Sequence, residues 1–210
     1  GSGKSTLVQL IGRFYDVTKG RIKVFGTDVK AYDLQTLREQ IGMVPQRAVL
    51  FRGTIRENLK VGKEDATDAE MQEALKTAQA LEVVEGRKEG LDAMVSEGGK
   101  NLSGGQRQRL TIARALVRKP RILILDDSAS ALDFATDARL RKALQENTED
   151  MTVFLVSQRV SSLMHADRIL VLEDGEPAGM GTHEELLKSC QVYREICRSQ
   201  LSEKEVQANG

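Results

Sequence analysis

Two features are missing from the 210-residue sequence, an excess of charge and a long apolar run, and each absence removes a class of function. Lys and Arg together number 31, as do Asp and Glu, so the formal net charge is zero. A chain without excess charge has no general affinity for nucleic acid or for an anionic membrane surface. No apolar run approaches the roughly 20 residues of a membrane-spanning helix. Any affinity for a phosphate-bearing ligand must therefore come from a local site.

Cysteine is also scarce, since only Cys190 and Cys197 are present. Their spacing matches no metal-binding pattern and would place both on one face of a helix. We expect reduced, half-buried thiols of a cytosolic protein. Internal repeats and low-complexity segments are absent as well. With 40% hydrophobic and 30% charged residues, the composition is typical of a globular protein.

Short apolar runs alternate with segments of helical periodicity along much of the chain. Strands are expected at 21–25, 41–45, 121–125, 152–156 and 168–172, and helices at 4–14, 33–40, 70–85, 106–118, 134–146 and 182–201. The runs at 121–125 and 152–156 indicate strands buried on both faces, as in a parallel sheet. The alternation predicts an α/β core. The stretch from about 54 to 118 reads as all-helical and predicts an inserted helical subdomain.

The first residues form a glycine-rich segment directly before an expected helix: Gly1, Ser2, Gly3, Lys4, Ser5 and Thr6. They match the second half of the pattern G-x-x-x-x-G-K-[ST]. Glycines let backbone N–H groups point at phosphate oxygens, and the helix adds its positive end. The pattern predicts an ATP site in which Lys4 reaches the β- and γ-phosphates and Ser5 ligates Mg²⁺. The alternative is a glycine turn before an ordinary helix.

Two acids, Asp126 and Asp127, follow the apolar run at 122–125. A carboxylate at the end of a buried strand is what a phosphate loop needs to hold its metal ion, and Asp126 is predicted to hold Mg²⁺ directly or through water. The alternative is a helix cap or a turn after the strand. Together, the two motifs predict nucleotide binding.

A second glycine-rich loop precedes a later helix and comprises Leu102, Ser103, Gly104, Gly105 and Gln106. Such a loop is a further anion site, although Ser103 and Gln106 also fit a capping box. One ATP cannot easily occupy two phosphate loops a hundred residues apart on one chain. The simplest arrangement is a head-to-tail dimer, with ATP between the first loop of one chain and the second loop of the other.

In order and spacing, these motifs resemble the ATP-binding cassette (ABC) family over nearly the whole chain. The resemblance implies a P-loop, RecA-like core and identifies 102–106 as the family signature. It implies that Gln46 is the Q-loop residue that senses Mg²⁺ and the γ-phosphate, and that Gln158 occupies the switch position. The D-loop, which crosses to the partner, would be Ser130, Ala131, Leu132 and Asp133.

Four segments resemble the exporter branch of that family: 50–59, 96–99, 166–169 and 181–187. The resemblance implies a place at the cytoplasmic face of a membrane transporter, where the regions of Gln46 and Glu97 meet the coupling helices of a membrane domain. It divides the chain into a first core part at 1–53, a helical subdomain at 54–118 and a second core part at 119–210. Because the chain begins inside the phosphate-loop pattern, we expect a fragment that lacks the family's N-terminal antiparallel β-subdomain.

Two residues depart from the family pattern. Asp127 stands where hydrolytic sites have Glu, and a misplacement near 1 Å can cost on the order of 10²-fold in rate. Gln158 stands where they have His, and an amide cannot become cationic. With the signature intact, these departures resemble the degenerate half of a heterodimeric exporter, whose own site is slow. The alternative is neutral change in an active homodimer.

Two other functions stay open on sequence grounds. One is a non-transport ABC ATPase that acts as a nucleotide-gated clamp on DNA or the ribosome. Neutral charge and the exporter-like segments argue against it, and no nucleic-acid partner is expected. The other is a binding module that uses ATP only to join two subunits.

Overall fold

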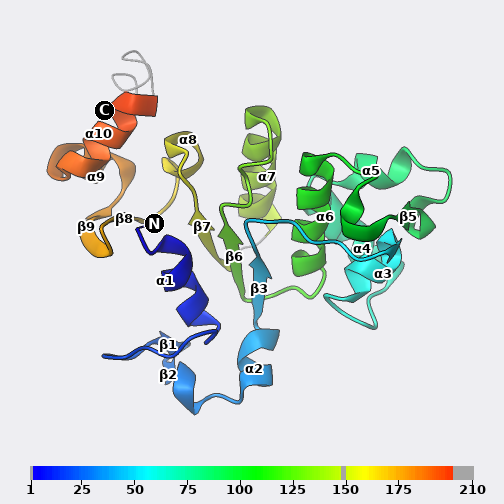
Figure 1. Cartoon of the computed structure of the whole chain (residues 1–210), viewed down its shortest axis with the longest axis horizontal. Helices are drawn as coiled ribbons and strands as arrows, with labels where there is room; N and C mark the ends of the chain where they lie inside the picture. Colours follow the sequence, from blue (N-terminus) through cyan, green and yellow to red (C-terminus); the bar gives the residue numbers. More distant parts are fainter. Residues whose placement is uncertain (1, 148–149, 201–210) are drawn as a thin grey trace.

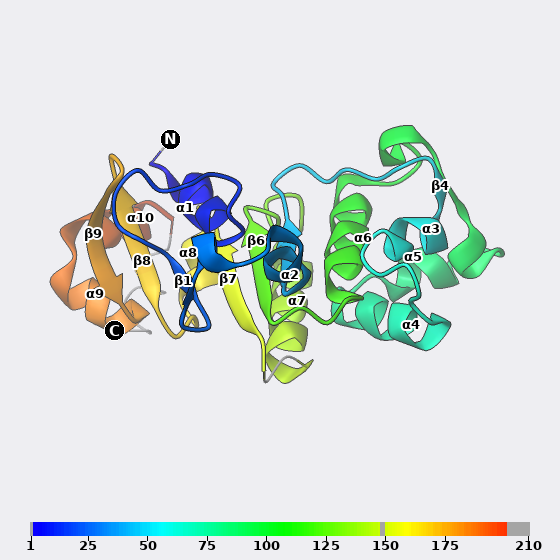
Figure 2. The same cartoon turned by 90° about the horizontal axis from the view of Figure 1, so that it is seen from below.

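The computed structural model describes residues 2–147 and 150–200, which form three parts in a row (Figure 1). The central part is a parallel sheet of three strands in the order β3 (Ile41–Val44), β6 (Ile122–Asp126) and β7 (Thr152–Val156). A mainly helical part lies on one side of it, and a hairpin with two helices lies on the other. Figure 2 shows the same order from below. The predicted α/β class, with a parallel-sheet core, is confirmed.

The central strand β6 is buried at every position, as its sequence predicts. Its side chains alternate between two clusters: Ile122 and Ile124 face one, and Leu123 and Leu125 face the other. β7 differs, because Thr152, Val153 and Phe154 are exposed. Within the described chain β7 pairs only with β6 and borders the sheet. The prediction that both runs are buried on both faces was therefore wrong for β7.

One face of the sheet is covered by α1 (Lys4–Ile11) and α2 (Leu34–Glu39), which place Val8 and Leu37 in one cluster with Ile124. A small hairpin of β1 (Lys23–Val24) and β2 (Thr27–Asp28) and a 3₁₀ turn at Val29–Ala31 connect them. Helix α1 is shorter than the predicted 4–14, because Arg13 adopts a positive φ of 50° that ends the helix.

The other face is covered by α7 (Phe134–Asn147) and α6 (Gly104–Leu116), and α4 (Asp68–Thr77) packs against both of these helices. Buried side chains of all three helices join one cluster with Leu123 and Leu125. The helical part also contains α3 (Ile55–Lys60), α5 (Leu81–Glu85) and 3₁₀ turns at Gly90–Asp92 and Glu97–Gly99. The helix predicted at 70–85 is two helices, broken at Gln79 with a φ of 58°.

The stretch at 54–118 is not wholly helical. β4 (Gly53–Thr54) and β5 (Met94–Val95) form a short antiparallel ladder, which the prediction missed. A two-residue strand is too short to show a period-2 pattern in the sequence. The division of the chain at 53/54 and 118/119 stays a prediction.

The last part holds α8 (Val160–Leu163), a hairpin of β8 (Ile169–Glu173) and β9 (Glu176–Gly181), and helices α9 (His183–Ser189) and α10 (Gln191–Gln200). One helix was predicted at 182–201; it is interrupted at Cys190, whose backbone is extended, and its predicted end lies outside the described residues. Cys190 and Cys197 are therefore not on one helix face. Both are free and buried rather than half-buried. Of the helices in 2–147 and 150–200, none has the length and apolarity to cross a membrane.

Candidate nucleotide-binding site

A cavity of about 280 Å³ lies at the carboxyl edge of the parallel sheet, beside the start of α1. This edge collects the segments that follow the strands, because parallel strands all end on the same side. The cavity is lined by Ser2, Gly3, Lys4, Ser5, Thr6, Gln46, Asp127, Val156, Ser157 and Gln158. The described residues of the predicted phosphate loop thus share one cavity with all three predicted catalytic residues. Gly1 was also predicted in this loop and lies outside the described residues.

The start of α1 has the geometry of an anion-binding loop. Gly3 precedes the helix with a φ of 84°, which a residue without Cβ adopts at little cost. The first backbone N–H groups of a helix have no partner within it, so they can bind an anion at its positive end. Lys4 Nζ donates a hydrogen bond to Ser2 Oγ at 2.7 Å. The ammonium group is thereby held over the loop that precedes its own helix.

A hydroxyl and a buried carboxylate meet at the base of the loop. Ser5 Oγ donates to Asp126 Oδ1 at 2.8 Å, across 121 residues of sequence, and Asp126 is only 5% exposed. A buried carboxylate is costly without a compensating charge. Oxygen ligands of this kind suit Mg²⁺. In the described chain no three His, Cys, Asp or Glu side chains cluster as metal ligands. The hydroxyl and carboxylate of Ser5 and Asp126 fit an ion such as Mg²⁺, which keeps waters and phosphate oxygens as its other ligands.

The backbone turns sharply at Asp127, directly after β6. This residue has a positive φ of 46°, a conformation that Asp tolerates better than most residues. Its N–H donates to the carbonyl oxygen of Val156 at 2.9 Å. Gln46 Nε2 donates to Asp127 Oδ2 at 3.0 Å. The turn therefore directs the carboxylate into the cavity and places the Gln46 amide beside it.

The charge of Asp127 is disfavoured by its surroundings. Burial raises the pKa of Asp127, and the negative charge of Asp126 raises it further. The nearby cations Arg159 and Lys4 and the hydrogen bond from Gln46 act in the opposite direction. Asp127 thus takes up a proton more readily than an exposed carboxyl.

Gln158 is exposed and lines the cavity on the side of the loop that follows β7. Two neighbours of Gln158 in this loop were given no role by the sequence analysis. Ser157 Oγ accepts the backbone N–H of Arg159 at 3.0 Å. The Arg159 side chain donates to the carbonyl oxygens of Ser130 and Leu132 in the predicted D-loop and of Ala129 just before it. Only its place beside Gln158 in the sequence could have pointed to it.

The predicted D-loop follows β6 and leads into α7. Ser130, Ala131 and Asp133 are exposed, whereas Leu132 is 4% exposed. Asp133 accepts the backbone N–H of Thr136 at 2.9 Å, which is a helix-capping interaction. The exposed residues are the part of this loop that a second chain could contact.

The predicted signature, residues 102–106, does not line this cavity and begins α6 in the helical part (Figure 1). The capping box considered as an alternative is present: Gln106 N–H donates to Ser103 Oγ at 3.2 Å, and Ser103 N–H donates to Gln106 Oε1 at 3.0 Å. A hydroxyl that accepts a hydrogen bond can still donate its own hydrogen. The cap and a phosphate contact by Ser103 are therefore compatible. Glu97 is exposed in its 3₁₀ turn.

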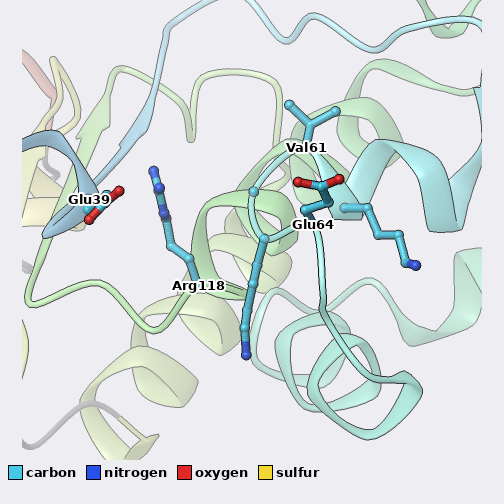
Figure 3. Close-up of a pocket in the computed structure, with 7 residues that line it drawn as sticks. Glu39, Val61, Glu64 and Arg118 are labelled. Atoms are coloured by element: carbon cyan, nitrogen blue, oxygen red, sulfur yellow. The ribbon is translucent and has the colours of Figure 1, made fainter. Parts of the chain in front are cut away.

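A larger hollow, of about 640 Å³, contains none of the predicted residues. In Figure 3 Glu39 and Arg118 lie on one side of it, and Val61 and Glu64 on the other. Its lining also includes Lys60, Gly62 and Lys63. Charges of both signs line this surface, so it does not select a ligand by charge.

Comparisons with known proteins identify the family of this chain. The model of the ABC transporter family matches residues 1–130. The chain belongs to the ABC transporter family. Among solved structures, a bacterial Atm1-family ABC exporter with ATP bound matches 96% of this chain with a TM-score of 0.92 and 38% sequence identity; the match covers 36% of that exporter chain.

Curated relatives of this ABC family member include two export proteins. A putative multidrug export ATP-binding/permease protein of Bacillus subtilis is 46% identical over 93% of this chain and 34% of its own length. A β-(1→2)glucan export ATP-binding/permease protein of Rhodopseudomonas palustris is 45% identical over 95% of this chain and 33% of its own length. The chain thus spans about a third of the curated relatives that it matches.

Proposed function

We propose that this chain is the ATP-binding and hydrolysing subunit of an ABC exporter, and that it works at the cytoplasmic face of a membrane. The observation that carries the proposal is the single cavity lined by the phosphate loop and Asp127, in which Ser5 is hydrogen-bonded to the buried Asp126. The exporter names of the relatives support the transport role. Because those relatives differ in what they export, the proposal names no transported substance.

In the proposed mechanism, Lys4 exchanges its contact with Ser2 for the β- and γ-phosphates of ATP. Ser5, Asp126 and Gln46 would hold Mg²⁺, which would neutralise charge on the phosphates when bound. Asp127 and Gln158 are the groups placed to orient a water against the γ-phosphate. Residues 102–106 of a partner cassette would close the site, and Glu97 would contact the coupling helices of a membrane domain.

We further propose that this chain's own site hydrolyses ATP slowly. Burial makes Asp127 a somewhat stronger base, but its side chain is one methylene shorter than that of Glu. A general base must lie about 2.6–3.2 Å from the water it activates. A raised pKa does not compensate for a side chain that is too short to approach that water. The neutral Gln158 amide adds no positive charge at the γ-phosphate. The signature 102–106 would complete the faster site of an unlike partner, which favours a heterodimer.

The test restores both residues in the full-length protein assembled with its partner, whose own phosphate loop is inactivated. The double variant D127E/Q158H should raise ATP turnover at this chain's site by about tenfold or more. The variant L170A, at a partly exposed residue of β8, serves as the control and should leave turnover unchanged. Fast hydrolysis by the unaltered chain as a homodimer, or no gain in the double variant, would contradict the slow-site proposal. The net charge of zero gives the clamp on DNA or the ribosome no support.

A further inference from the structure

Arg159 joins the switch loop to the loop after β6. Its Nη1 donates to the carbonyl oxygens of Leu132 at 3.0 Å and Ala129 at 3.3 Å. Its Nη2 donates to the carbonyl oxygen of Ser130 at 3.0 Å. The guanidinium carbon also lies 5.0 Å from the ring centre of Phe134. One side chain thus holds three carbonyls of a segment 27 to 30 residues upstream.

The chemistry of this contact requires arginine. A guanidinium presents several N–H donors in a rigid planar fork and can stack on an aromatic ring. A lysine ammonium is a compact point charge, which cannot span three separate carbonyls in the same way. The contact therefore depends on the shape of the side chain as well as on its charge.

The backbone from which Arg159 extends is fixed on its other side by α10. The Gln200 side-chain amide donates from Nε2 to the carbonyl oxygen of Gln158 at 2.7 Å. Its Oε1 accepts the backbone N–H of Val160 at 2.9 Å. The two bonds bracket Arg159, so a displacement of the switch loop would move the guanidinium with it.

The loop that Arg159 holds also touches the start of the signature helix α6. A Cβ built on Gly105 would lie 3.4 Å from the carbonyl oxygen of Ala131 and 3.7 Å from Leu132 Cδ2. The 130–133 loop therefore lies between Arg159 on one side and Gly105 on the other. The cavity residue Gln158 and the signature are connected within one chain by contacts of this loop.

We propose that Arg159 is a positioning residue that couples the two nucleotide sites: it fixes the 130–133 loop between the switch loop of this chain's own site and the signature that serves the partner's site. This inference rests on the proposed function, in which residues 102–106 complete a site on a second cassette. The occupancy of one site would change the position of Gln158, and Arg159 would pass that change to Ala131 and Gly105. Arg159 itself touches no nucleotide in this arrangement.

The first test measures hydrogen exchange in the nucleotide-free, full-length protein. Replacing Arg159 with Ala should make the backbone amides of residues 129–134 exchange roughly tenfold faster. The reason is that three carbonyl groups of this segment lose their hydrogen bonds to the guanidinium. R159K should fall between R159A and the unaltered protein. R168A, which alters an exposed arginine just before β8, is the matched control and should leave exchange at 129–134 unchanged.

The second test measures ATP turnover in the assembled protein. R159A should lower the kcat of the partner's site by about tenfold, a typical size for coupling between sites. ATP affinity at this chain's phosphate loop and the KM for ATP should stay within about twofold. Q200A, which loosens the same loop from α10, should shift kcat in the same direction by a smaller factor.

The outcomes separate this inference from the proposed function. Unchanged exchange at 129–134 in R159A overturns the positioning role, and faster exchange with an unchanged partner-site kcat overturns the coupling. If the unaltered assembly hydrolyses no ATP, the proposed function fails. In that case faster exchange in R159A still supports the positioning of the loop by Arg159, and unchanged exchange overturns it.

Discussion

Two helices of this chain begin at glycine-rich loops, and they differ in what surrounds them. At the start of α1, Lys4 and Ser5 line one cavity with Asp127, and Ser5 donates a hydrogen bond to Asp126. The start of α6 is closed by its own capping box and carries no acidic residue in its first turn. Both helix ends attract anions. Only the first has the carboxylates that a metal ion needs, so under the proposed function the two loops would have different roles at a shared nucleotide.

The largest effect should follow from removing the cation of the first loop. K4A should lower ATP affinity by on the order of 10²-fold, because a charge-assisted hydrogen bond to phosphate contributes about 1.5–3 kcal/mol. Calorimetric titration of the full-length protein measures it. K60A, in the larger hollow of mixed charge, is the control. Equal losses in K4A and K60A would mean that the smaller cavity is not the nucleotide site.

Because Asp126 lies next to Ser5, ATP binding at the phosphate loop should depend on Mg²⁺. In the unaltered protein, removing Mg²⁺ with a chelator should weaken ATP binding by roughly tenfold, since the ion bridges protein and phosphates. In D126N the affinities with and without Mg²⁺ should be nearly equal. Persistence of the full magnesium effect in D126N would place the cation elsewhere.

The second loop should show a stability effect that can be separated from its effect on the partner. S103A should lower the free energy of unfolding by about 1 kcal/mol, because it removes a helix cap. T67A removes the equivalent cap of α4 and should cost the same. Only S103A should also lower turnover at the partner's site. Chemical denaturation and ATPase assays on the same samples measure both, and equal turnover in S103A and T67A would contradict a phosphate contact by Ser103.

The smallest effect concerns the sign of pH dependence. The folded-state pKa of Asp127 is raised by burial and then by Asp126, so its favourable contribution to stability is present at low pH and is lost as the pH rises through that pKa. The pKa of Asp133 is lowered, mainly by the backbone N–H of Thr136. Its contribution is present above the ordinary carboxyl pKa and is lost as the pH falls through the lowered value.

Thermal unfolding from acidic to neutral pH tests the two signs together. Relative to the unaltered protein, D127N should gain stability as the pH rises above the ordinary carboxyl range. D133N keeps a capping side chain but carries no charge. It should be less stable than the unaltered protein above the ordinary carboxyl range, and the two stabilities should become equal below it. If the stability of both variants, relative to the unaltered protein, changed in the same direction as the pH rises, the surroundings of Asp127 would not disfavour its charge.

The residues of the candidate site were named from the motifs and from the family resemblance, and the strand order explains why they meet. Gln46 follows β3, Asp127 follows β6 and Gln158 follows β7, and parallel strands end on one edge of a sheet. Their roles in chemistry stay predictions. The capping box at Ser103 was also recognisable in the sequence, since it depends only on residues three positions apart.

The features that sequence did not reveal depend on particular backbone angles or distant contacts. Gln79 adopts a positive φ and Cys190 is extended, yet hydrophobic periodicity runs through both positions. The exposure of Val153 in β7 depends on which elements cover the strand, which a local apolar run does not contain. The partners of Arg159 are backbone carbonyls, and these carry no residue-specific signal.

The left-handed backbone at Asp127 has a consequence for the history of this position. Asp and Asn adopt that conformation more readily than Glu does, and a poorly suited residue there costs on the order of 1 kcal/mol. A lineage that has settled on aspartate therefore gives up a little folding stability if it regains the longer acid, before any catalytic benefit arrives. Under this geometry aspartate is the less strained of the two acids, and a chain with glutamate at position 127 should unfold slightly more easily than the unaltered protein.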